Sequence, residues 1–224
     1  MHPYAVVEDF ESALCEFTGF KRAVTTNSCT MALLLALNYK LTGNSEGAGL
    51  PTNLPLQDRQ RVGIPKHTYV GVPMSIMHAG GRPTFRHDND WQQLGYYPLL
   101  FQSGTSHVVD SARFFAKDMA QYFHRSDMVC VSFHWSKPLG IQQGGAILHN
   151  HPKPDAWLRR ARFDGRTQGC PPARDFCHTI GWHCYMPPEM AAAGLVRLSF
   201  IPTYNLMEQE TGYPDLSKME IFNA

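Results

Sequence analysis

Lys137 is the residue whose type and surroundings most clearly point to chemistry. It lies at the apex of a polar turn within Val129 to Asn150, a run typical of two short β-branched strands around that turn. Its neighbours, from Phe133 through Pro138 to the Gly144-Gly145 pair, are mostly aromatic or small. Such surroundings desolvate an ammonium and lower its pKa, and an amine that loses its proton easily can form a Schiff base. The alternative is a solvated lysine in a surface turn, which local sequence alone favours.

Asp110 is the second candidate. It ends a short apolar strand that begins at Ser106, and α/β sheets bind ligands at the carboxyl ends of buried parallel strands. The alternative is that Asp110 caps the N-terminus of a helix.

A third candidate is the start of a helix that is apolar nearly all round. Thr26-Asn27-Ser28-Cys29-Thr30 precedes Met31 to Tyr39, and Ser28 is a suitable N-cap. A buried helix that starts this way directs free backbone N–H groups at whatever lies before it, which suits a phosphate. The alternative is that Ser28 and Thr30 only cap the helix.

These stretches resemble, in chain order, the motifs of the DegT/DnrJ/EryC1/StrS family of aminotransferases, which use pyridoxal 5′-phosphate (PLP) and act mostly on nucleotide-linked keto-sugars. Ser132-Phe133-His134-Trp135-Ser136-Lys137 and the later Gly144-Gly145-Ala146 are similar to the family's Ser-Phe-His-x-x-Lys and Gly-Gly-Ala. Ser28-Cys29-Thr30-Met31-Ala32-Leu33 is similar to its Ser-Gly-Thr-x-Ala-Leu. His67-Thr68-Tyr69 and the Gly181 to Met186 stretch also follow family patterns.

The resemblance implies a role for each matching residue. Lys137 would carry PLP and then act as general acid and base, and Asp110 would pair with the pyridine nitrogen. Tyr69 would stack on the ring. His183 would reach the cofactor of a partner subunit. The remaining expected cofactor contacts are Ser28, Cys29, Thr30, Arg113 and Ser132.

The chain departs from the family pattern in several places. Cys29 stands where the family has glycine, Arg113 replaces a glutamine or histidine and could add an anion contact, and Tyr185 replaces an arginine. Residues 91–106 are too short for the helix and strand that a full-length member has there. After Ser199 only a short tail remains, so most of the small C-terminal domain is missing.

Three cysteines suggest a different chemistry. Cys170, Cys177 and Cys184 fall seven residues apart, with His178 and His183 beside them, and could be drawn as a zinc site. Structural zinc favours closely spaced pairs such as C-x₂-C, which are absent, so no metal site is predicted. The other cysteines fit reduced core thiols.

The elements that must position these residues alternate between helix and strand. Helices are expected at 6–17, 31–39, 70–79 and 156–162, the last a basic helix with a solvated face. Strands are expected at 21–25, 61–65, 82–86 and 106–110 and on either side of Lys137. The pattern and the resemblance predict a three-layer α/β sandwich with a mostly parallel sheet, like the large domain of fold-type I PLP enzymes.

We expect one domain over residues 1–224, because 224 residues with 43% hydrophobic content can build one sizeable core. Its PLP-binding core is expected at about 20–150, and 151–224 as a helical dimer-contact region with a truncated tail. The net charge of +1 gives no bulk attraction for nucleic acid. The start lacks the pattern of a secretory leader, and the longest apolar run is too short to span a bilayer, so a cytoplasmic location is expected.

The sequence therefore predicts a PLP-dependent enzyme of aminotransferase type, in a homodimer with shared active sites, acting on a small-molecule or carrier-linked amino or keto substrate. One alternative is a PLP-dependent decarboxylase or lyase acting on an amino-acid-modified nucleotide or nucleic acid, because the same cofactor supports several bond cleavages. Another is a catalytically inactive binding homologue.

Overall fold

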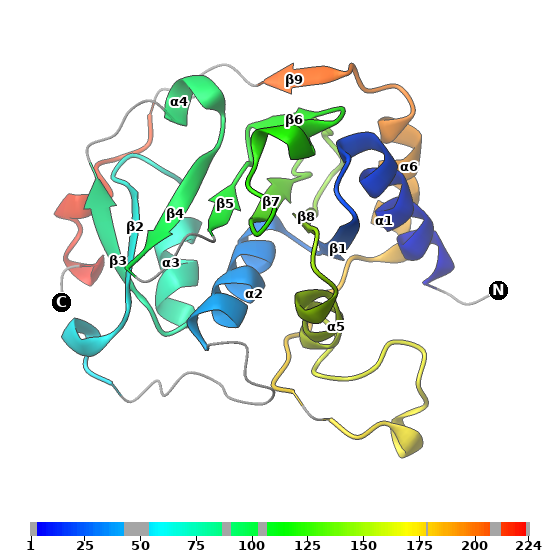
Figure 1. The fold of residues 1–224 in the computed structure, drawn as a ribbon, viewed down its shortest axis with the longest axis horizontal. Helices are drawn as coiled ribbons and strands as arrows, with labels where there is room; N and C mark the ends of the chain where they lie inside the picture. The colour runs from blue at the N-terminus through cyan, green and yellow to red at the C-terminus, as the bar shows by residue number, and fades with distance from the viewer. Residues whose placement is uncertain are drawn as a thin grey trace.

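Seven strands form one sheet in the order β1-β8-β7-β5-β4-β2-β3 (Figure 1). This computed structural model describes residues 4–42, 54–86, 91–102, 107–177, 179–206 and 212–222. The strands of the sheet are β1 (Arg22–Thr26), β2 (Arg61–Pro65), β3 (Arg82–Arg86), β4 (Tyr97–Phe101), β5 (Val108–Asp110), β7 (Met128–Ser132) and β8 (Gly145–His149). A second, two-stranded sheet pairs β6 (Phe114–Ala116) with β9 (Tyr204–Leu206).

Strand direction divides the large sheet into two groups. Strand β2 pairs parallel with β3, and β5 pairs parallel with β7. Strands β4 and β8 run opposite to the others, so every pair that includes one of them is antiparallel. The predicted mostly parallel direction is therefore confirmed, within a sheet that is mixed in its pairing.

Helices cover both faces of this sheet and complete the predicted three layers. They are α1 (Ala5–Thr18), α2 (Cys29–Leu41), α3 (Gly71–His78), α4 (Trp91–Leu94), α5 (Pro152–Ala161) and α6 (Pro188–Leu198). Short 3-10 helices are η1 (Leu56–Asp58), η2 (Met119–Tyr122), η3 (Pro172–Arg174), η4 (Leu216–Lys218) and η5 (Glu220–Phe222). Helices α2, α3 and α5 share one apolar core with the sheet, whereas α1 and α6 share the other (Figure 1).

Successive residues of one central strand show how the pleat feeds these two cores. In β7, Met128 and Cys130 face the core with α2, whereas Val129 and Val131 face the core with α1. This alternation follows from the two-residue period of an extended chain. None of the helices in the described part of the chain is long and apolar enough to cross a membrane.

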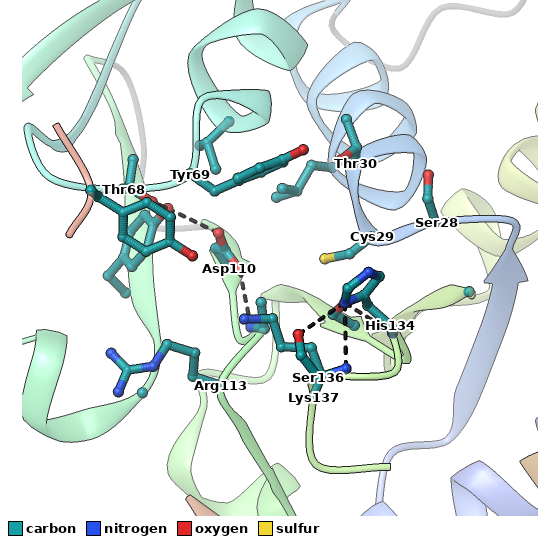
Figure 2. Close-up of a pocket in the computed structure, with 18 of the residues that line it drawn as sticks. Ser28, Cys29, Thr30, Thr68, Tyr69, Asp110, Arg113, His134, Ser136 and Lys137 are labelled. Atoms are coloured by element: carbon teal, nitrogen blue, oxygen red, sulfur yellow. Dashed lines mark hydrogen bonds between the residues drawn. The ribbon is translucent and has the colours of Figure 1, made fainter. Parts of the chain in front are cut away.

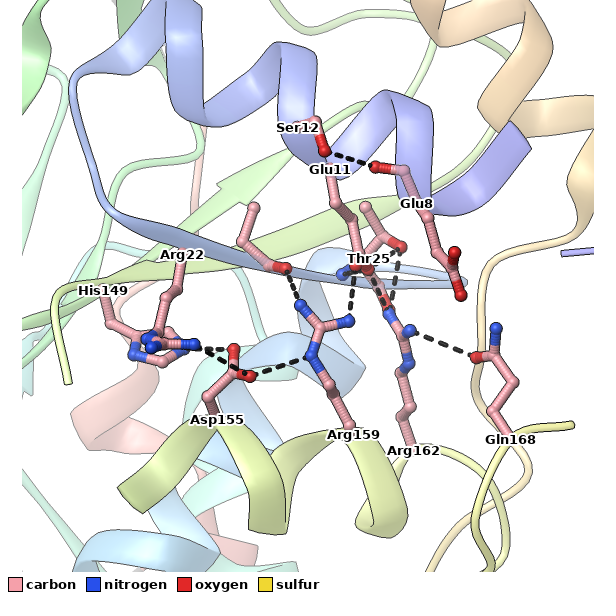
Figure 3. Close-up of polar contacts among 11 residues, drawn as sticks. Glu8, Glu11, Ser12, Arg22, Thr25, His149, Asp155, Arg159, Arg162 and Gln168 are labelled. Carbon is pink, nitrogen blue, oxygen red and sulfur yellow. Dashed lines mark hydrogen bonds and ion pairs between the residues drawn. The ribbon is translucent and has the colours of Figure 1, made fainter. Parts of the chain in front are cut away.

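A buried ionic network joins the sequence-distant elements α1, β1 and α5 (Figure 3). Glu11 on α1 pairs with Arg162, which follows α5, and its other carboxylate oxygen lies 2.6 Å from Nη1 of Arg159. Arg162 also donates to the carbonyl of Thr25 on β1, at 2.8 Å. The expectation that this basic helix has a solvated face is therefore wrong for Arg162, whose side chain is only 1% exposed. This pairing could not be predicted from the sequence, because Glu11 and Arg162 are far apart in the chain.

The C-terminal residues 212–222 pack on the β3 side of the sheet, far from α1 and α6 (Figure 1). The backbone N–H of Leu216 donates to the carbonyl of Lys66 at 2.9 Å, and Nδ1 of His67 lies 3.0 Å from the carbonyl of Tyr213. The ring of Phe222 is buried against Phe85. Residues 212–222 of the expected truncated tail therefore pack as part of the fold.

Candidate active site

A cavity of about 580 Å³ opens at the sheet edge where β5 and β7 end, beside the N-termini of α2 and α3 (Figure 2). Its volume lies within the usual range for small-ligand sites. The residues that line it include Ser28, Cys29, Thr30, Thr68, Tyr69, Tyr97, Asp110, Arg113, Ser132, His134, Ser136, Lys137 and Tyr213. The structure thus brings all the predicted site residues together except His183.

Lys137 and Asp110 reach this cavity from neighbouring strands. Asp110 is the last residue of β5, and Lys137 follows β7 in the loop that leads to β8. These strands are parallel neighbours, and Asp110 is in register with Cys130 on β7. Lys137 is half-buried and faces the cavity, which argues against the alternative of a solvated turn lysine. No helix starts at Asp110, so the helix-cap alternative for this residue is wrong.

The carboxylate of Asp110 is buried and held by hydrogen bonds. The backbone N–H of Ala112 donates to Oδ1 at 3.0 Å, and the hydroxyl of Tyr97 donates to Oδ2 at 2.9 Å. Burial raises the pKa of Asp110 above its ordinary value, while the hydrogen bonds from Tyr97 and Ala112 and the charge of Lys137 act in the opposite direction. An acid in this setting suits a cationic partner inside the cavity.

The N-terminus of α2 supplies groups for an anion. Ser28 is the N-cap, and its hydroxyl oxygen accepts from the N–H of Met31 at 3.2 Å, as predicted. Ser28, Cys29 and Thr30 all line the cavity. The first N–H groups of a helix have no acceptor within the helix and carry the positive end of its dipole, so they favour a phosphate. The hydroxyl of Ser132, at the end of β7, lines the same cavity.

The backbone of Cys29 lies close to Gly145, the first residue of β8. A Cβ atom built on Gly145 would lie 2.5 Å from the backbone nitrogen of Cys29, so only glycine allows β8 to approach α2 this closely. Burial raises the pKa of the Cys29 thiol well above its ordinary value, the negative charge of Asp110 adds to this effect, and the thiol keeps its proton.

Tyr69 and Arg113 complete the predicted set on the wall of the cavity. Tyr69 stands before α3, lines the cavity and is 55% exposed. Arg113 lies in the turn between β5 and β6 and is almost fully buried at the cavity wall.

His183 lies outside the cavity. Its exposed ring pairs with Asp164, with Nδ1 and Oδ2 2.8 Å apart, and packs edge-on against Tyr185. This position allows no contact with the cavity of the same chain, and the role in a partner's site stays a prediction. Of the cysteines and histidines that could be drawn as a zinc site, His178 lies outside the described residues. No three His, Cys, Asp or Glu side chains of the described residues gather as metal ligands would.

Sequence reasoning missed several cavity residues. No role was predicted for Thr68, which is part of a matched motif, and Tyr97 lies in a segment for which no strand was predicted. Tyr213 comes from the tail, for which no role was predicted. Only Thr68 carried a signal, because it stands beside Tyr69 at the end of a predicted strand.

Comparison with known proteins supports the resemblance. Residues 1–93 match the family model of the DegT/DnrJ/EryC1/StrS aminotransferase family. No curated protein sequence is significantly similar to this chain. The resemblance seen in the sequence is thus confirmed for the N-terminal part, which contains Ser28, Cys29, Thr30 and Tyr69.

Solved structures share the fold over most of the chain. A candidate PLP-dependent aminotransferase from Bacillus cereus superposes with a TM-score of 0.63 at 18% identity, over 87% of this chain and 58% of that one. Helicobacter pylori PseC, an aminotransferase of pseudoaminic acid biosynthesis, gives 0.62 at 19% over 87% and 57%. The sugar aminotransferase CalS13 from Micromonospora echinospora gives 0.63 at 16% over 87% and 60%. The chain therefore has the fold of these aminotransferases and spans less than two thirds of their length.

Proposed function

We propose that this protein is a PLP-dependent enzyme of aminotransferase type, and that Lys137 and Asp110 are its catalytic residues. The observation that carries the proposal is the shared cavity, in which one amine and one buried carboxylate face the N-terminus of a capped helix (Figure 2). When bound, PLP supplies an aldehyde that condenses with an amine and a pyridine ring that accepts electrons from the substrate carbon.

The residues present fit the parts of this cofactor. The phosphate suits the N-terminus of α2 with Ser28, Thr30 and Ser132, because these supply N–H and O–H donors. The ring suits the space beside Tyr69, and the ring nitrogen suits Asp110, whose buried carboxylate favours a bound proton on its partner. The aldehyde suits the amine of Lys137.

Each side chain then has one chemical task. With PLP bound, the free amine of Lys137 would hold and return the proton that moves at the substrate carbon. Asp110 keeps a proton on the ring nitrogen, which its burial makes effective because little water competes for its charge. Tyr69 would stack on the ring and hold it in the cavity.

The absorbance spectrum of the purified protein with added PLP tests this proposal. We expect a visible, lysine-linked absorbance band, lost in Lys137→Ala and retained in Lys153→Ala, which removes an exposed lysine on α5. Equal spectra for the two variants would rule out Lys137 as the cofactor lysine. Product analysis with amino acids and keto acids then separates transamination from decarboxylation and elimination.

We further propose that the site is completed in a homodimer, with His183 acting on the partner's cofactor. The support is its position, exposed and outside the cavity of its own chain. Mixing Lys137→Ala with His183→Ala subunits should restore part of the activity, because the mixed dimer has one site with both residues intact. No recovery in a mixture shown to contain mixed dimers would contradict this arrangement.

The substrate is proposed to be an amino or keto compound, small or carried on a nucleotide or other carrier. The cavity of about 580 Å³ is large enough for a small ligand, which supports a small amino or keto compound. Efficient turnover of free amino acids, without turnover of carrier-bound ones, would contradict the carrier-linked form.

A further inference from the structure

Tyr97 and Asp110 are neighbours because of the way two strands pair. Tyr97 is the first residue of β4, Asp110 is the last residue of β5, and the two are directly opposite each other in the antiparallel register. Residues paired in this way point to the same face, with Cβ atoms roughly 4.5–5.5 Å apart. Because β4 runs against β5, its beginning lies at the edge where β5 ends, which is the edge of the cavity.

A hydrogen-bond chain leads through Tyr97 to the carboxylate. The Tyr97 hydroxyl donates to Oδ2 of Asp110 at 2.9 Å, and it lies 2.7 Å from Oγ1 of Thr68. A phenol has one proton, and Tyr97 gives it to Asp110, so Thr68 must donate to Tyr97. Thr68 is 2% exposed and Tyr97 3%, so little water competes for these bonds.

The donor-to-acceptor direction of these hydrogen bonds favours negative charge on Asp110. Each donor points toward the carboxylate, and Ala112 holds the other oxygen through its backbone N–H. A carboxylate can accept all of these bonds, whereas a protonated acid would have to turn one oxygen into a donor. The arrangement therefore stabilises the ionised form and fixes the plane of the group.

Four titratable side chains face Asp110 from the surrounding elements. They are Cys29 at the start of α2, Tyr97 on β4, Cys130 on β7 and Lys137 after β7. Burial raises the pKa of both thiols and of the phenol well above their ordinary values, so these three stay neutral. Of the four, only Lys137 brings charge.

We propose that Tyr97, supported by Thr68, is a positioning residue that keeps Asp110 ionised and oriented toward the cavity. The proposal rests on the proposed function, in which Asp110 pairs with the ring nitrogen of PLP. Tyr97 lies in residues 91–106, where the chain departs from the family pattern, so its role does not follow from the resemblance.

Tyr97→Phe tests the proposal because it keeps the ring and removes only the hydroxyl. Carboxyl ¹³C NMR of the cofactor-free protein, with Asp110 assigned by its loss in Asp110→Asn, should show the pKa of Asp110 raised by about 1–2 units, the expected effect of losing one hydrogen bond to a charged group. Tyr96→Phe is the matched control, since Tyr96 packs in the Phe114 and Phe123 cluster instead, and should leave the titration unchanged. An unchanged titration in Tyr97→Phe overturns the proposal.

PLP affinity measured against pH gives a second readout. A raised pKa leaves Asp110 protonated over a wider range, so Tyr97→Phe should weaken binding about tenfold at pH values between the wild-type pKa and the new one, and approach the wild type above and below that range. A loss that is equal at every pH means a merely structural role and overturns the proposal.

The NMR titration and the PLP measurement together distinguish failure of the proposed function from failure of the proposal about Tyr97. If the wild type binds no PLP, the proposed function fails, while the NMR titration still decides whether Tyr97 controls the ionisation of Asp110. If Tyr97→Phe does not fold, Thr68→Val is used, which removes the donor to Tyr97 and should raise the pKa of Asp110 by a smaller amount. No rise in that variant contradicts the proposal.

Discussion

Arg162 and Glu11 form an ion pair inside the protein, with 1% and 5% of their side chains exposed. Burial alone would raise the pKa of Glu11, but the charges of Arg162 and Arg159 outweigh it and lower that pKa. The pair ties the N-terminal helix to the end of α5 across β1 (Figure 3). The ion pair therefore helps to hold the end of α5 beside β1.

Glu11→Gln should destabilise the protein strongly, because Arg162 would be left as a buried charge without its counter-ion. The expected loss in the free energy of unfolding is about 3–5 kcal/mol, measured by urea denaturation. Glu8→Gln, on the exposed side of the same helix, is the control and should change stability by less than about 0.5 kcal/mol. Equal effects of the two substitutions would contradict the role of the pair.

Asp155 should make stability fall as acid is added. Burial alone would raise its pKa, but the ion pair with His149 and the hydrogen bond and charge of Arg159 lower it to about 2. A carboxyl with a lowered pKa stabilises the fold above its unfolded pKa of about 3.9 and loses this contribution as the pH falls toward 2. Asp155→Asn should therefore flatten the dependence of stability on pH between about 4 and 2.

Circular dichroism during acid titration measures this dependence. Asp9→Asn is the control, because Asp9 is exposed on α1. A wild-type acid profile in Asp155→Asn would contradict the prediction.

Gly145→Ala should disturb the proposed phosphate-binding site at the start of α2. The added Cβ would meet the backbone nitrogen of Cys29 at 2.5 Å and its Cα at 2.7 Å, and neither atom can move without the start of α2. We expect a stability loss of about 1–3 kcal/mol and weaker PLP binding.

Gly63→Ala, on β2, is the matched control, since its nearest neighbour would be a flexible Arg86 carbon at 3.4 Å. Thermal unfolding and a PLP titration of both variants measure the difference. Unchanged PLP affinity in a folded Gly145→Ala protein would mean that the start of α2 does not hold the cofactor.

Leu216→Ala should loosen the C-terminal segment from the β3 side of the sheet. The side chain is fully buried, so its truncation should cost about 2–5 kcal/mol. Because Tyr213 on the same segment lines the cavity, PLP affinity should also fall. Ile221→Ala, with 54% of its side chain exposed, should change neither quantity by much. Similar results for both variants would show that the segment is not anchored by Leu216.

The elements around the site were largely predictable because their signals are local. The strands 61–65 and 82–86 have the predicted bounds, and the helix predicted at 6–17 runs from Ala5 to Thr18. Helix α1 ends at Gly19, whose φ of +80° suits glycine. Ser28 and Asp110 could be chosen because each stands at the end of an element with a clear pattern, whereas Lys137 lies in the loop after β7 and was chosen through its resemblance to the family motif.

What could not be predicted depends on contacts between distant parts of the chain. The Glu11 and Arg162 pair has no local signature, and helical periodicity alone assigned the arginine to solvent. Tyr97 was missed because residues 91–106 gave no strand signal, and because its importance comes from its register with Asp110. Tyr213 was also missed, because only tertiary packing brings the C-terminal segment to the cavity.

The reversed direction of β4 changes which residues a sheet can offer to a ligand. A parallel strand needs a long crossover connection and delivers its last residues to the ligand-binding edge, whereas a reversed strand is joined to its neighbour by a short connection and delivers its first residue. Here residues 102–107 suffice between β4 and β5. The first residue of β4, Tyr97, and the last residue of β5, Asp110, therefore line the same cavity although their strands run in opposite directions.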